Sequence, residues 1–364
     1  MKLLFLGDFF YDYDGEVRDI SRIAGYLAEQ DCKVIVNLET AVFSCGKPIK
    51  KRGPNLKSTP VLVDLLKKMH CACVCLANNH AMDFGEASLV ATMERLEGEG
   101  IACVGAGRNL EEATRHARLC EAGETVLLQN FGWDVEETVY ASAGHGGCAP
   151  LNREDVIERT RELRARNPEA RLVNIFHWGF EYNALPMPRD IQLAHDCVRA
   201  GCDLIVGHHP HVVQPFEIFE GAPIFYSLGN FYFGSRRDAF PTCFSNEPRI
   251  NCADYGLGLL WDTQTGEHRA IGVEYDRAAG ETTIGGDAAH ILSELDADSW
   301  RREDYAALAR RHAYKPNPIL GLDERENRRL LRILKLKYGV AAQFRKLERW
   351  PLARHIYDCL KSRA

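Results

Sequence analysis

The chain has 364 residues, of which 46% are hydrophobic and 26% are charged, and its formal net charge is −6. This balance is typical of a folded globular protein and excludes collagen-like, low-complexity and wholly disordered classes. A net negative charge also excludes an overall electrostatic attraction to nucleic acid, so we expect no nucleic-acid partner. The sequence leaves the oligomeric state open.

Three further features indicate where the protein works. No apolar stretch approaches the length that spans a bilayer, so we expect no membrane segment. The N-terminus reaches Asp8 too early for a signal peptide, and we interpret it as the opening strand of the fold. The 13 cysteines show no disulfide spacing, which indicates reduced thiols in a cytoplasmic protein.

As far as Gly234, short apolar runs alternate with amphipathic segments. The apolar runs predict buried strands at Leu3–Leu6, Val34–Val36, Cys71–Leu76, Ala102–Val104, Val126–Leu128, Val173–Phe176, Leu204–Val206 and Ile224–Tyr226. The amphipathic segments predict helices at Val17–Glu29, Val61–Lys68, Ala87–Glu97, Leu110–Leu119, Asp155–Arg166 and Ile191–Arg199. This alternation favours an α/β architecture with largely internal strands.

The pattern changes after Gly234. Ser235–Asp254 is rich in polar residues and proline and is predicted to be a long loop. Gly256–Trp261 and Ala270–Glu274 alternate as a hairpin does, with its turn near Thr265.

The last part of the chain is predicted to be helical. From about Ala288 it is rich in Arg, Lys and Glu and carries its own apolar stripe. We therefore expect residues 1–285 to form the α/β domain and residues 286–364 to form a C-terminal helical appendage. A partner-binding helix pair is the alternative interpretation of the appendage.

Metal-capable residues follow five of the predicted strands. They are Asp8, Glu39, Asn79 with His80, His177, and the group His208, His209 and His211. Because the loops at the carboxyl ends of strands meet in one crevice of an α/β sheet, we expect these side chains to converge. Carboxylate, amide and imidazole ligands suit divalent zinc, iron and manganese. Such a set predicts a binuclear centre able to clamp both ends of a displacement at phosphorus.

The motifs that carry these residues also resemble a known family. They are Gly7-Asp8, Asn37-Leu38-Glu39, the run from Leu76 to Gly85, His177-Trp178-Gly179-Phe180-Glu181-Tyr182, Gly207-His208-His209-Pro210-His211-Val212 and Tyr226-Ser227-Leu228-Gly229-Asn230-Phe231. Over about the first two-thirds of the chain they resemble the CapA family. That family is associated with poly-γ-glutamate capsule biosynthesis and belongs to the calcineurin-like metallophosphatase superfamily. The resemblance implies a metallophosphatase-like four-layer αββα sandwich for residues 1–285.

The resemblance also implies a role for each residue of the centre. Asp8 and His211 would bind the first metal, and Glu39 would bridge the two ions. The second metal would be held by Asn79, His177 and His209.

The same resemblance makes His80 the catalytic histidine that protonates a leaving group or steadies the transition state. Asp83 is expected to order the following loop, either as a helix N-cap or as a partner of His80. His208 is expected to lie outside the ligand set, around it or at the surface.

The chain departs from the superfamily pattern at two places. Phe10 stands where superfamily phosphatases usually carry a histidine ligand, and Glu39 replaces the usual bridging aspartate. The CapA branch shares both changes. They leave the first metal one ligand short, and Asp12 or Asp14 are open alternatives for the replacement.

Five residues are predicted to contact substrate. Trp178, Glu181 and Tyr182 follow His177 closely enough to line the pocket, and Arg189 is expected to meet an anionic group. Asn230 is expected at the pocket floor, where Ser227 lacks the nucleophile-elbow pattern of a serine hydrolase.

Three functions follow from this sequence. The first is a metal-dependent hydrolase of the phosphoesterase type, which uses a metal-activated hydroxide at a binuclear site on an anionic substrate. The second is a cytoplasmic accessory protein of poly-γ-glutamate or another capsule or envelope polymer, which binds or cleaves a polyanionic chain. The third is a non-catalytic module that recruits a partner through its C-terminal helices.

Overall fold

A computed structural model of the chain describes residues 1–11, 18–43, 46–51, 53–133, 138–234, 253–296, 299–301, 304–305 and 309. Contacts divide the chain into a unit of residues 1–314 and a unit of residues 315–364, and every described residue belongs to the first. The C-terminal part of the predicted helical appendage, residues 310–364, therefore lies outside the described residues.

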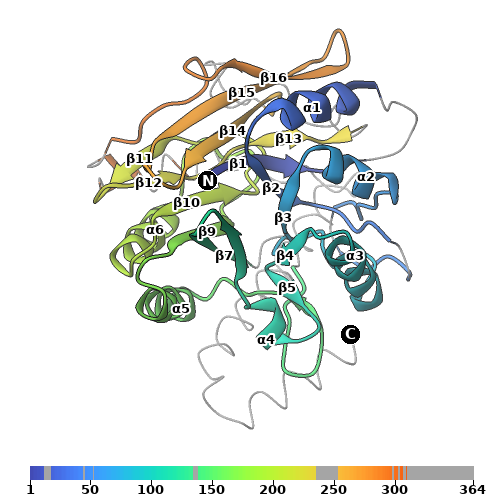
Figure 1. Ribbon diagram of the computed structural model, residues 1–364, viewed down its shortest axis with the longest axis horizontal. Helices are drawn as coiled ribbons and strands as arrows, with labels where there is room; N and C mark the ends of the chain where they lie inside the picture. Colours follow the sequence, from blue (N-terminus) through green and yellow to red (C-terminus); the bar gives the residue numbers. More distant parts are fainter. Residues whose placement is uncertain are drawn as a thin grey trace, which may run out of the picture. The chain divides into compact units, whose positions relative to one another are not determined.

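The N-terminal strand β1 (Lys2–Phe9) lies inside an eight-stranded sheet (Figure 1). The strand order is β16-β15-β14-β1-β2-β3-β4, and β13 pairs with the end of β1. β1 to β4 are parallel, whereas β14 to β16 run antiparallel to their neighbours. The other strands are β2 (Lys33–Leu38), β3 (Cys71–Cys75), β4 (Ala102–Val104), β13 (Asn230–Tyr232), β14 (Tyr255–Asp262), β15 (His268–Asp276) and β16 (Glu281–Asp287).

A second sheet of six strands has the order β11-β12-β10-β9-β7-β6. Its four central strands are parallel, and its two edge strands, β6 and β11, are antiparallel. The strands are β6 (Ala117–Glu121), β7 (Glu124–Gly132), β9 (Arg171–His177), β10 (Leu204–His208), β11 (Phe216–Phe219) and β12 (Ala222–Phe225). A small separate sheet pairs β5 (Ala106–Gly107) with β8 (Gly147–Cys148).

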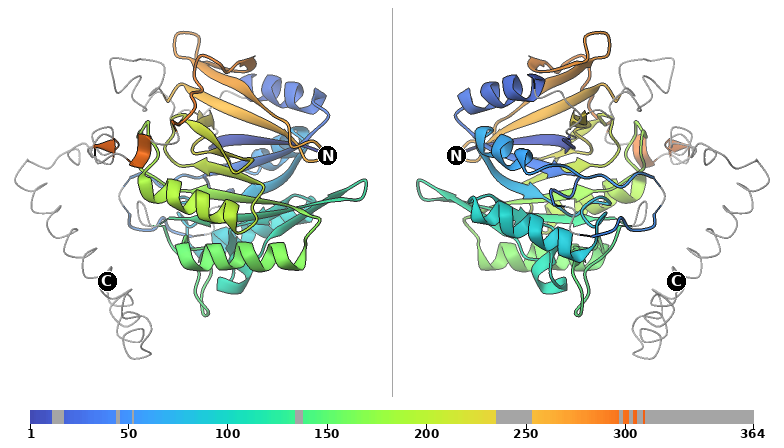
Figure 2. Two further views of the ribbon diagram at one scale, coloured as in Figure 1. Left: turned by 90° about the vertical axis from the view of Figure 1, so that its left-hand side faces the viewer. Right: turned by 90° about the vertical axis from the view of Figure 1, so that its right-hand side faces the viewer.

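Helices cover the outer face of each sheet (Figure 2). The first sheet is covered by α1 (Arg18–Glu29), α2 (Val61–Lys68) and α3 (Glu86–Gly98), and the second by α5 (Arg153–Arg166) and α6 (Pro188–Arg199). Alternation along β1 sends Leu3 and Phe5 into the core between the sheets and Leu4 and Leu6 into the core beneath α1 to α3. The predicted four-layer αββα sandwich is confirmed.

Burial on both faces explains why the strands could be found in the sequence. An internal parallel strand is apolar throughout, and each of the eight predicted strands overlaps a strand of the structure. The hairpin predicted after residue 255 is β14 and β15, and β16 adds a third strand that the sequence analysis missed.

One predicted helix is wrong over most of its length. Helix α4 (Leu110–Ala113) ends after four residues, and Ala117–Glu121 is strand β6 instead of the rest of a helix over Leu110–Leu119. Ala117 and Leu119 face inward while Arg118 and Cys120 face outward, which is the period of a strand. The open edge of β7 supplies the hydrogen-bond partners that decide this segment.

The region after β16 also differs from the expectation. Residues 288–296 form turns and a β-bridge, so the helix predicted from Ala288 does not begin there. Ala288, Ile291 and Leu295 pack into the cores of the sandwich. The domain boundary expected after residue 285 therefore falls within β16, and the sandwich continues beyond it. Of the long loop predicted at Ser235–Asp254, residues 235–252 lie outside the described residues.

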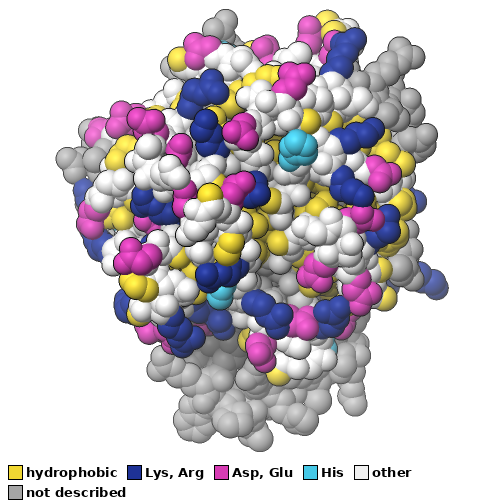
Figure 3. All heavy atoms as spheres, in the orientation of Figure 1, with side chains coloured by type: hydrophobic (Ala, Val, Ile, Leu, Met, Phe, Trp, Pro, Cys, Tyr) yellow, Lys and Arg dark blue, Asp and Glu magenta, His cyan; other side chains and the backbone are white. Residues whose placement is uncertain are grey.

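Three further features of the described residues concern surface charge, helix hydrophobicity and cysteines. On the face in Figure 3, Lys and Arg side chains alternate with Asp and Glu side chains. No helix in the described part of the chain is long and apolar enough to cross a bilayer. The nine cysteines that the structure describes are all free, and six of them are buried.

Candidate metal centre

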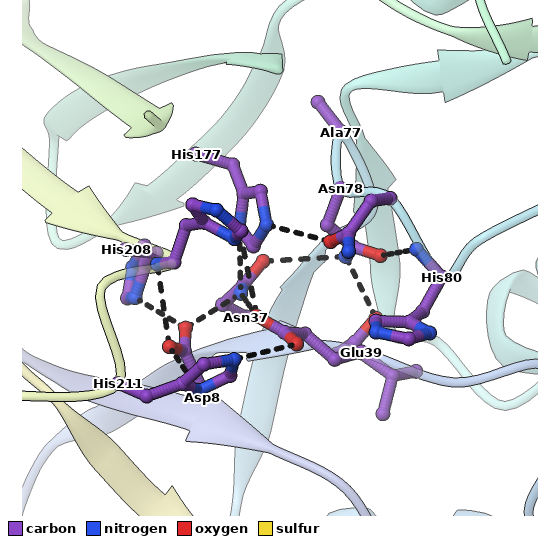
Figure 4. Close-up of polar contacts among 12 residues, drawn as sticks. Asp8, Asn37, Glu39, Ala77, Asn78, His80, His177, His208 and His211 are labelled. Atoms are coloured by element: carbon purple, nitrogen blue, oxygen red, sulfur yellow. Dashed lines mark hydrogen bonds and ion pairs between the residues drawn. The ribbon is translucent and has the colours of Figure 1, made fainter. Parts of the chain in front are cut away.

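The metal-capable residues of both sheets meet at the carboxyl ends of five parallel strands. Asp8 lies near the end of β1, Glu39 directly after β2, and Asn79 and His80 after β3. From the second sheet, His177 is the last residue of β9, and His209 and His211 follow β10. Figure 4 shows Asp8, Glu39, His177 and His211 turned toward one another between the two sheets.

The loop after β10 is held in an unusual conformation. His209 and His211 have φ values of 94° and 56°, in the left-handed region that non-glycine residues rarely adopt. Each costs about 1–3 kcal/mol and persists only where surrounding contacts impose it. One such contact is the backbone N–H of His209, which donates to Oδ2 of Asp8 at 3.2 Å. The strain therefore accompanies the placement of both imidazoles beside Asp8.

Asp8, Glu39 and His211 form the most compact group. Each offers one possible ligand atom, and these atoms lie within 4.8 Å of one another. Nδ1 of His211 is 3.3 Å from Oδ2 of Asp8, and Nε2 is 3.9 Å from Oε2 of Glu39. All three residues are buried. Two carboxylates and an imidazole in such a group are able to hold a divalent cation.

The other three predicted ligands lie next to this group. Nε2 of His177 is 2.9 Å from Oδ1 of Asn79, and its Nδ1 is 3.6 Å from Oε1 of Glu39. The rings of His177 and His209 are 4.6 Å apart. The structure thus brings all six predicted ligand residues into one cluster, with Glu39 between the two halves.

Several buried oxygen and nitrogen atoms of this cluster, each able to bind a metal, lack hydrogen bonds among the described residues. Oε2 of Glu39 and both ring nitrogens of His209 have no hydrogen-bond partner among the described residues, although both side chains are fully buried. An unsatisfied buried polar group costs about 1–3 kcal/mol, and more when it is charged. A divalent cation would satisfy these atoms, so the residues present fit a metal centre.

The ionisation of the carboxylates supports the same interpretation. Burial opposes the charge of Asp8, but the neighbouring imidazoles of His208 and His211 outweigh it and hold its pKa well below the usual range. Burial and the charge of Asp8 raise the pKa of Glu39 well above its usual range. Two adjacent buried carboxylates repel each other, and a cation between them would relieve that repulsion.

The imidazoles divide into neutral and charged members. Burial lowers the pKa of His209 to about 3 and that of His177 well below its usual range, so both rings are neutral near pH 7, the form that binds metals. Burial also disfavours the charged form of His211, but Glu39 and Asp8 outweigh it and raise its pKa to about 10. The proton on His211 therefore offsets the negative charge of Asp8 and Glu39, which a bound metal ion would otherwise offset.

Asn37 is a site residue to which the sequence analysis gave no role. Its Nδ2 lies 2.8 Å from Oδ1 of Asp8, 3.0 Å from Oε1 of Glu39 and 3.3 Å from Nδ1 of His177. Its place two residues before Glu39 could have predicted this role, since alternate residues of a strand share a face.

His80 is held by a buried pair of charges. Its Nδ1 lies 2.8 Å from Oδ2 of Asp83 and 3.0 Å from Nζ of Lys51. Lys51 also forms an ion pair with Asp83 and donates to the carbonyl of Asn79 at 3.0 Å. The expected partnership of Asp83 with His80 is confirmed, whereas the N-cap of α3 is Gly85. Lys51 was missed because its segment carries no motif.

Two residues predicted to contact substrate are engaged in packing. The indole of Trp178 stacks on Phe176 at 4.6 Å and donates from Nε1 to the carbonyl of Tyr226 at 2.8 Å, so it lies in the core of the second sheet. Asn230 is fully buried, and its Oδ1 lies 2.9 Å from Nδ1 of His211. Asn230 therefore orients the imidazole of His211, which leaves Nε2 directed at Glu39.

Of the other three predicted substrate residues, Glu181 and Tyr182 lie near His211, and Arg189 contacts Trp133. The charge of Glu181 acts on both Glu39 and His211. The ring of Tyr182 is 6.1 Å from that of His211. The half-exposed guanidinium of Arg189 stacks on the ring of Trp133 at 3.3 Å.

The two departures from the superfamily pattern are visible in the structure. Phe10 is buried against Leu56 and Phe233, with 5.5 Å between the phenyl rings, so this position is apolar. Asp12 and Asp14, the two open alternatives, lie outside the described residues. Ser227, the rejected nucleophile, donates its hydroxyl to the carbonyl of Val212 at 2.7 Å.

Comparison with protein families now identifies the chain. Residues 7–235 match the family model described as "Bacterial capsule synthesis protein PGA_cap". The chain belongs to this family. The match spans all the metal-capable residues described above and confirms the resemblance to CapA proteins.

Two relatives each match about half of the chain. The chain is 36% identical over 181 residues to the PGA biosynthesis protein CapA of Bacillus subtilis, which covers 49% of this chain and 47% of that protein. It is 30% identical over 207 residues to a probable polyglutamine synthesis accessory protein of Mycobacterium tuberculosis, with 54% of each chain covered. The chain thus spans about half the length of these relatives.

Solved structures with a similar arrangement include two nucleotidases. The NAD nucleotidase of Haemophilus influenzae has a TM-score of 0.41 and 10% identity, and the match covers 85% of this chain and 60% of that chain. A 5′-nucleotidase precursor from Thermus thermophilus has a TM-score of 0.40 and 15% identity, with 86% and 57% covered.

Proposed function

We propose that this protein is a metal-dependent hydrolase of the phosphoesterase type, with a centre for two divalent ions of manganese, iron or zinc. The observation that carries this proposal is the buried cluster of Asp8, Glu39 and His211 beside His209. Neither ring nitrogen of His209 has a hydrogen-bond partner among the residues that the structure describes. A mixed set of carboxylate and imidazole ligands suits manganese, iron and zinc better than it suits metals that prefer thiolate ligands.

Each ligand has a place in the proposed centre. Asp8 and His211 would hold the first ion, and Glu39, which lies between the two halves of the cluster, would be shared by both ions. Asn79, His177 and His209 would hold the second ion. The amide of Asn79 contributes an oxygen without adding charge, which keeps the loaded centre attractive to an anionic substrate. When bound, the ions would acidify a water molecule and neutralise charge on a phosphoryl oxygen.

His80 is the catalytic residue proposed beside the metal ligands. Burial lowers its pKa to about 4, so the ring is neutral near pH 7. Of the two roles expected from the sequence, this favours steadying the transition state over delivering a proton. Asp83 and Lys51 position the ring through Nδ1, while Nε2 has no hydrogen-bond partner among the described residues.

Substrate would bind across the loop that follows His177. We assign Glu181, Tyr182 and Arg189 to the edge of the site, with the guanidinium of Arg189 held flat by Trp133 for a planar anionic group. Trp178 contributes by packing in the core of the second sheet, and Asn230 contributes by orienting the imidazole of His211.

The first test is metal content per chain, measured by elemental analysis. The wild-type chain is expected to hold two equivalents, and the His209→Ala/His211→Ala double variant is expected to lose most of this metal. His145→Ala is the matched control, because His145 is exposed and bonded only to Ser142 in the described structure. The loaded wild type should then hydrolyse a phosphomonoester or phosphodiester such as p-nitrophenyl or bis-p-nitrophenyl phosphate. A metal-loaded chain without such activity would disprove the phosphoesterase assignment.

A second candidate function comes from the names of the relatives. Those names refer to PGA biosynthesis and to polyglutamine synthesis. In this case the same centre serves a cytoplasmic accessory of polymer metabolism that binds or cleaves a polyanionic chain. Measurable binding or cleavage of a γ-glutamyl polymer by metal-loaded protein that leaves phosphoesters intact would favour this candidate.

A further inference from the structure

The first metal position of the proposed centre lacks one imidazole. Phe10 occupies the place where the superfamily pattern has a histidine, and its ring packs against Leu56 and Phe233. Within the described residues, Asp8 and His211 are then the terminal ligands of this ion, with Glu39 shared between the two ions. Divalent ions of this kind take at least four ligands, so another side chain or water must complete the set.

His208 is placed by the sheet to supply a ligand. It is the last residue of β10 and pairs in register with His177, the last residue of β9. Paired residues of neighbouring parallel strands project from the same face of the sheet, so the two imidazoles point into the same space. Figure 4 shows the His208 ring next to Asp8. Of the two places expected for His208, around the ligand set or at the surface, the surface is wrong, since only 2% of the residue is exposed.

The contact between His208 and Asp8 is short but incomplete. Nδ1 of His208 lies 3.3 Å from Oδ1 of Asp8, yet this nitrogen has no aligned hydrogen bond among the described residues. Oδ2 of the same carboxylate faces His211 at 3.3 Å. Two imidazoles therefore flank one carboxylate, one at each oxygen.

A shared cation explains this geometry better than a direct pair does. Two ligand atoms that each lie about 2.1 Å from one ion are roughly 3.0–3.5 Å apart, which is the separation found here. An aligned imidazolium–carboxylate hydrogen bond would be shorter, about 2.7–2.9 Å. Leaving a buried imidazole nitrogen unsatisfied is also costly, whereas coordination would use its lone pair.

We propose that Nδ1 of His208 is a ligand of the first metal ion and replaces the imidazole that Phe10 cannot provide. This inference rests on the proposed metal centre but not on any particular reaction. It makes His208, beside His209 and His211, the third imidazole that β10 and the loop after it contribute to the centre. Asp12 and Asp14 are then not required as replacements.

The test is direct detection of the metal–nitrogen bond. The full chain is labelled with ¹⁵N-histidine and loaded with ¹¹³Cd²⁺, and one-bond cadmium–nitrogen coupling is read on each imidazole. Coupling is expected on Nδ1 of His208, with its signal assigned by its loss in His208→Gln. A positioning residue that only contacts Asp8 would show no such coupling.

Metal affinity provides a second measurement. His208→Ala is expected to weaken the binding of one of two zinc equivalents at least tenfold in a chelator competition, whereas His145→Ala should not change it. Two tightly held equivalents in His208→Ala, or metal-loaded wild type without coupling on His208, would overturn the inference. Since the coupling is read in the wild type, a variant that fails to fold does not affect that result.

The outcomes also separate this inference from the proposed function. A wild-type chain that binds no metal disproves both. Coupling on His208 in a protein that hydrolyses no phosphoester confirms the ligand and removes only the proposed activity.

Discussion

Lys51 and Asp83 form an ion pair that is almost completely excluded from water. Only 1% of the Lys51 side chain and none of the Asp83 side chain is exposed. The ammonium group donates to the carbonyl of Asn79, and Asp83 accepts from the backbone N–H of Leu56 at 2.6 Å. Such a pair contributes little net stability by itself, but breaking it leaves a buried charge without a partner.

Lys51→Met is therefore expected to lower the free energy of unfolding by about 3–5 kcal/mol. The substitution leaves the carboxylate of Asp83 buried beside His80 without its cation. Unfolding by urea, followed by circular dichroism, measures the loss. Lys50→Met is the matched control, because Lys50 is exposed, and it should change stability by no more than about 0.5 kcal/mol.

The double variant Lys51→Met/Asp83→Asn distinguishes this mechanism from simple loss of packing. Removing both charges should cost less than the sum of the two single substitutions. Strictly additive losses would show that the charges are not coupled.

At the residue scale, the sequence predicted which residues converge better than it predicted the contacts that support them. Asp8, Glu39 and His177 were identifiable because each stands at or after the end of an apolar strand. Lys51 comes from a segment without regular structure and reaches His80 from 29 residues away. That contact depends on the path of the chain after β2, which no local pattern encodes.

Among the elements, β10 and the loop after it contribute three of the imidazoles near Asp8. This arrangement requires close contact with the backbone that follows β12. A Cβ atom on Gly207 would lie 1.9 Å from the carbonyl oxygen of Tyr226 and 2.5 Å from Nε1 of Trp178. The absence of a side chain at Gly207 therefore allows the end of β10 to approach Tyr226.

Gly207→Ala is expected to destabilise the protein by at least about 2 kcal/mol, because the backbone of Tyr226 or of β10 must move. It should also weaken metal binding, because the following residues are His208, His209 and His211.

Gly98→Ala provides the contrast, since nothing lies within 4 Å of its added Cβ at the end of α3. Alanine there should be neutral or stabilise the protein by up to about 1 kcal/mol. Thermal unfolding should show a lower melting temperature for Gly207→Ala and an equal or higher one for Gly98→Ala. Equal melting temperatures for the two variants would contradict the close contact proposed at Gly207.

The error at Leu110–Leu119 also belongs to the element scale. The predicted helix does form over Leu110–Ala113, where Asn109 caps it by accepting a hydrogen bond from the backbone N–H of Glu112. Beyond that point the edge of β7 was available for pairing, and tertiary hydrogen bonds outweighed local preference.

At the scale of the whole molecule, a buried carboxyl group at the start of α6 should make stability depend on pH. Burial raises the pKa of Asp190 to about 6, while Arg189 partly opposes this. The folded state therefore binds more protons at Asp190 than the unfolded state between about pH 4 and pH 6. The contribution of Asp190 to stability accordingly falls as pH rises through this range and is constant above it.

Asp190→Asn should therefore become more stable relative to wild type as pH rises from 4 to 7, by up to about 3 kcal/mol. Urea unfolding of both proteins at each pH gives this difference directly. Asp64→Asn, at an exposed position of α2, is the control and should show a difference below about 0.5 kcal/mol throughout. A constant difference for Asp190→Asn across the range would contradict the raised pKa.

The sequence by itself determined the α/β class, the positions of most strands and helices, and the six residues that converge on the centre. It could do so because internal parallel strands are apolar along their whole length, and because ligands follow strand ends. The tertiary structure decided which side chains touch. The packing of two sheets brings His208 against Asp8 and Asn230 against His211, and the path of the chain after β2 brings Lys51 against His80. The partners in these three contacts are 200, 19 and 29 residues apart in sequence. Such contacts depend on the distance between strand ends in space, which is set by the packed core and not by the residues themselves.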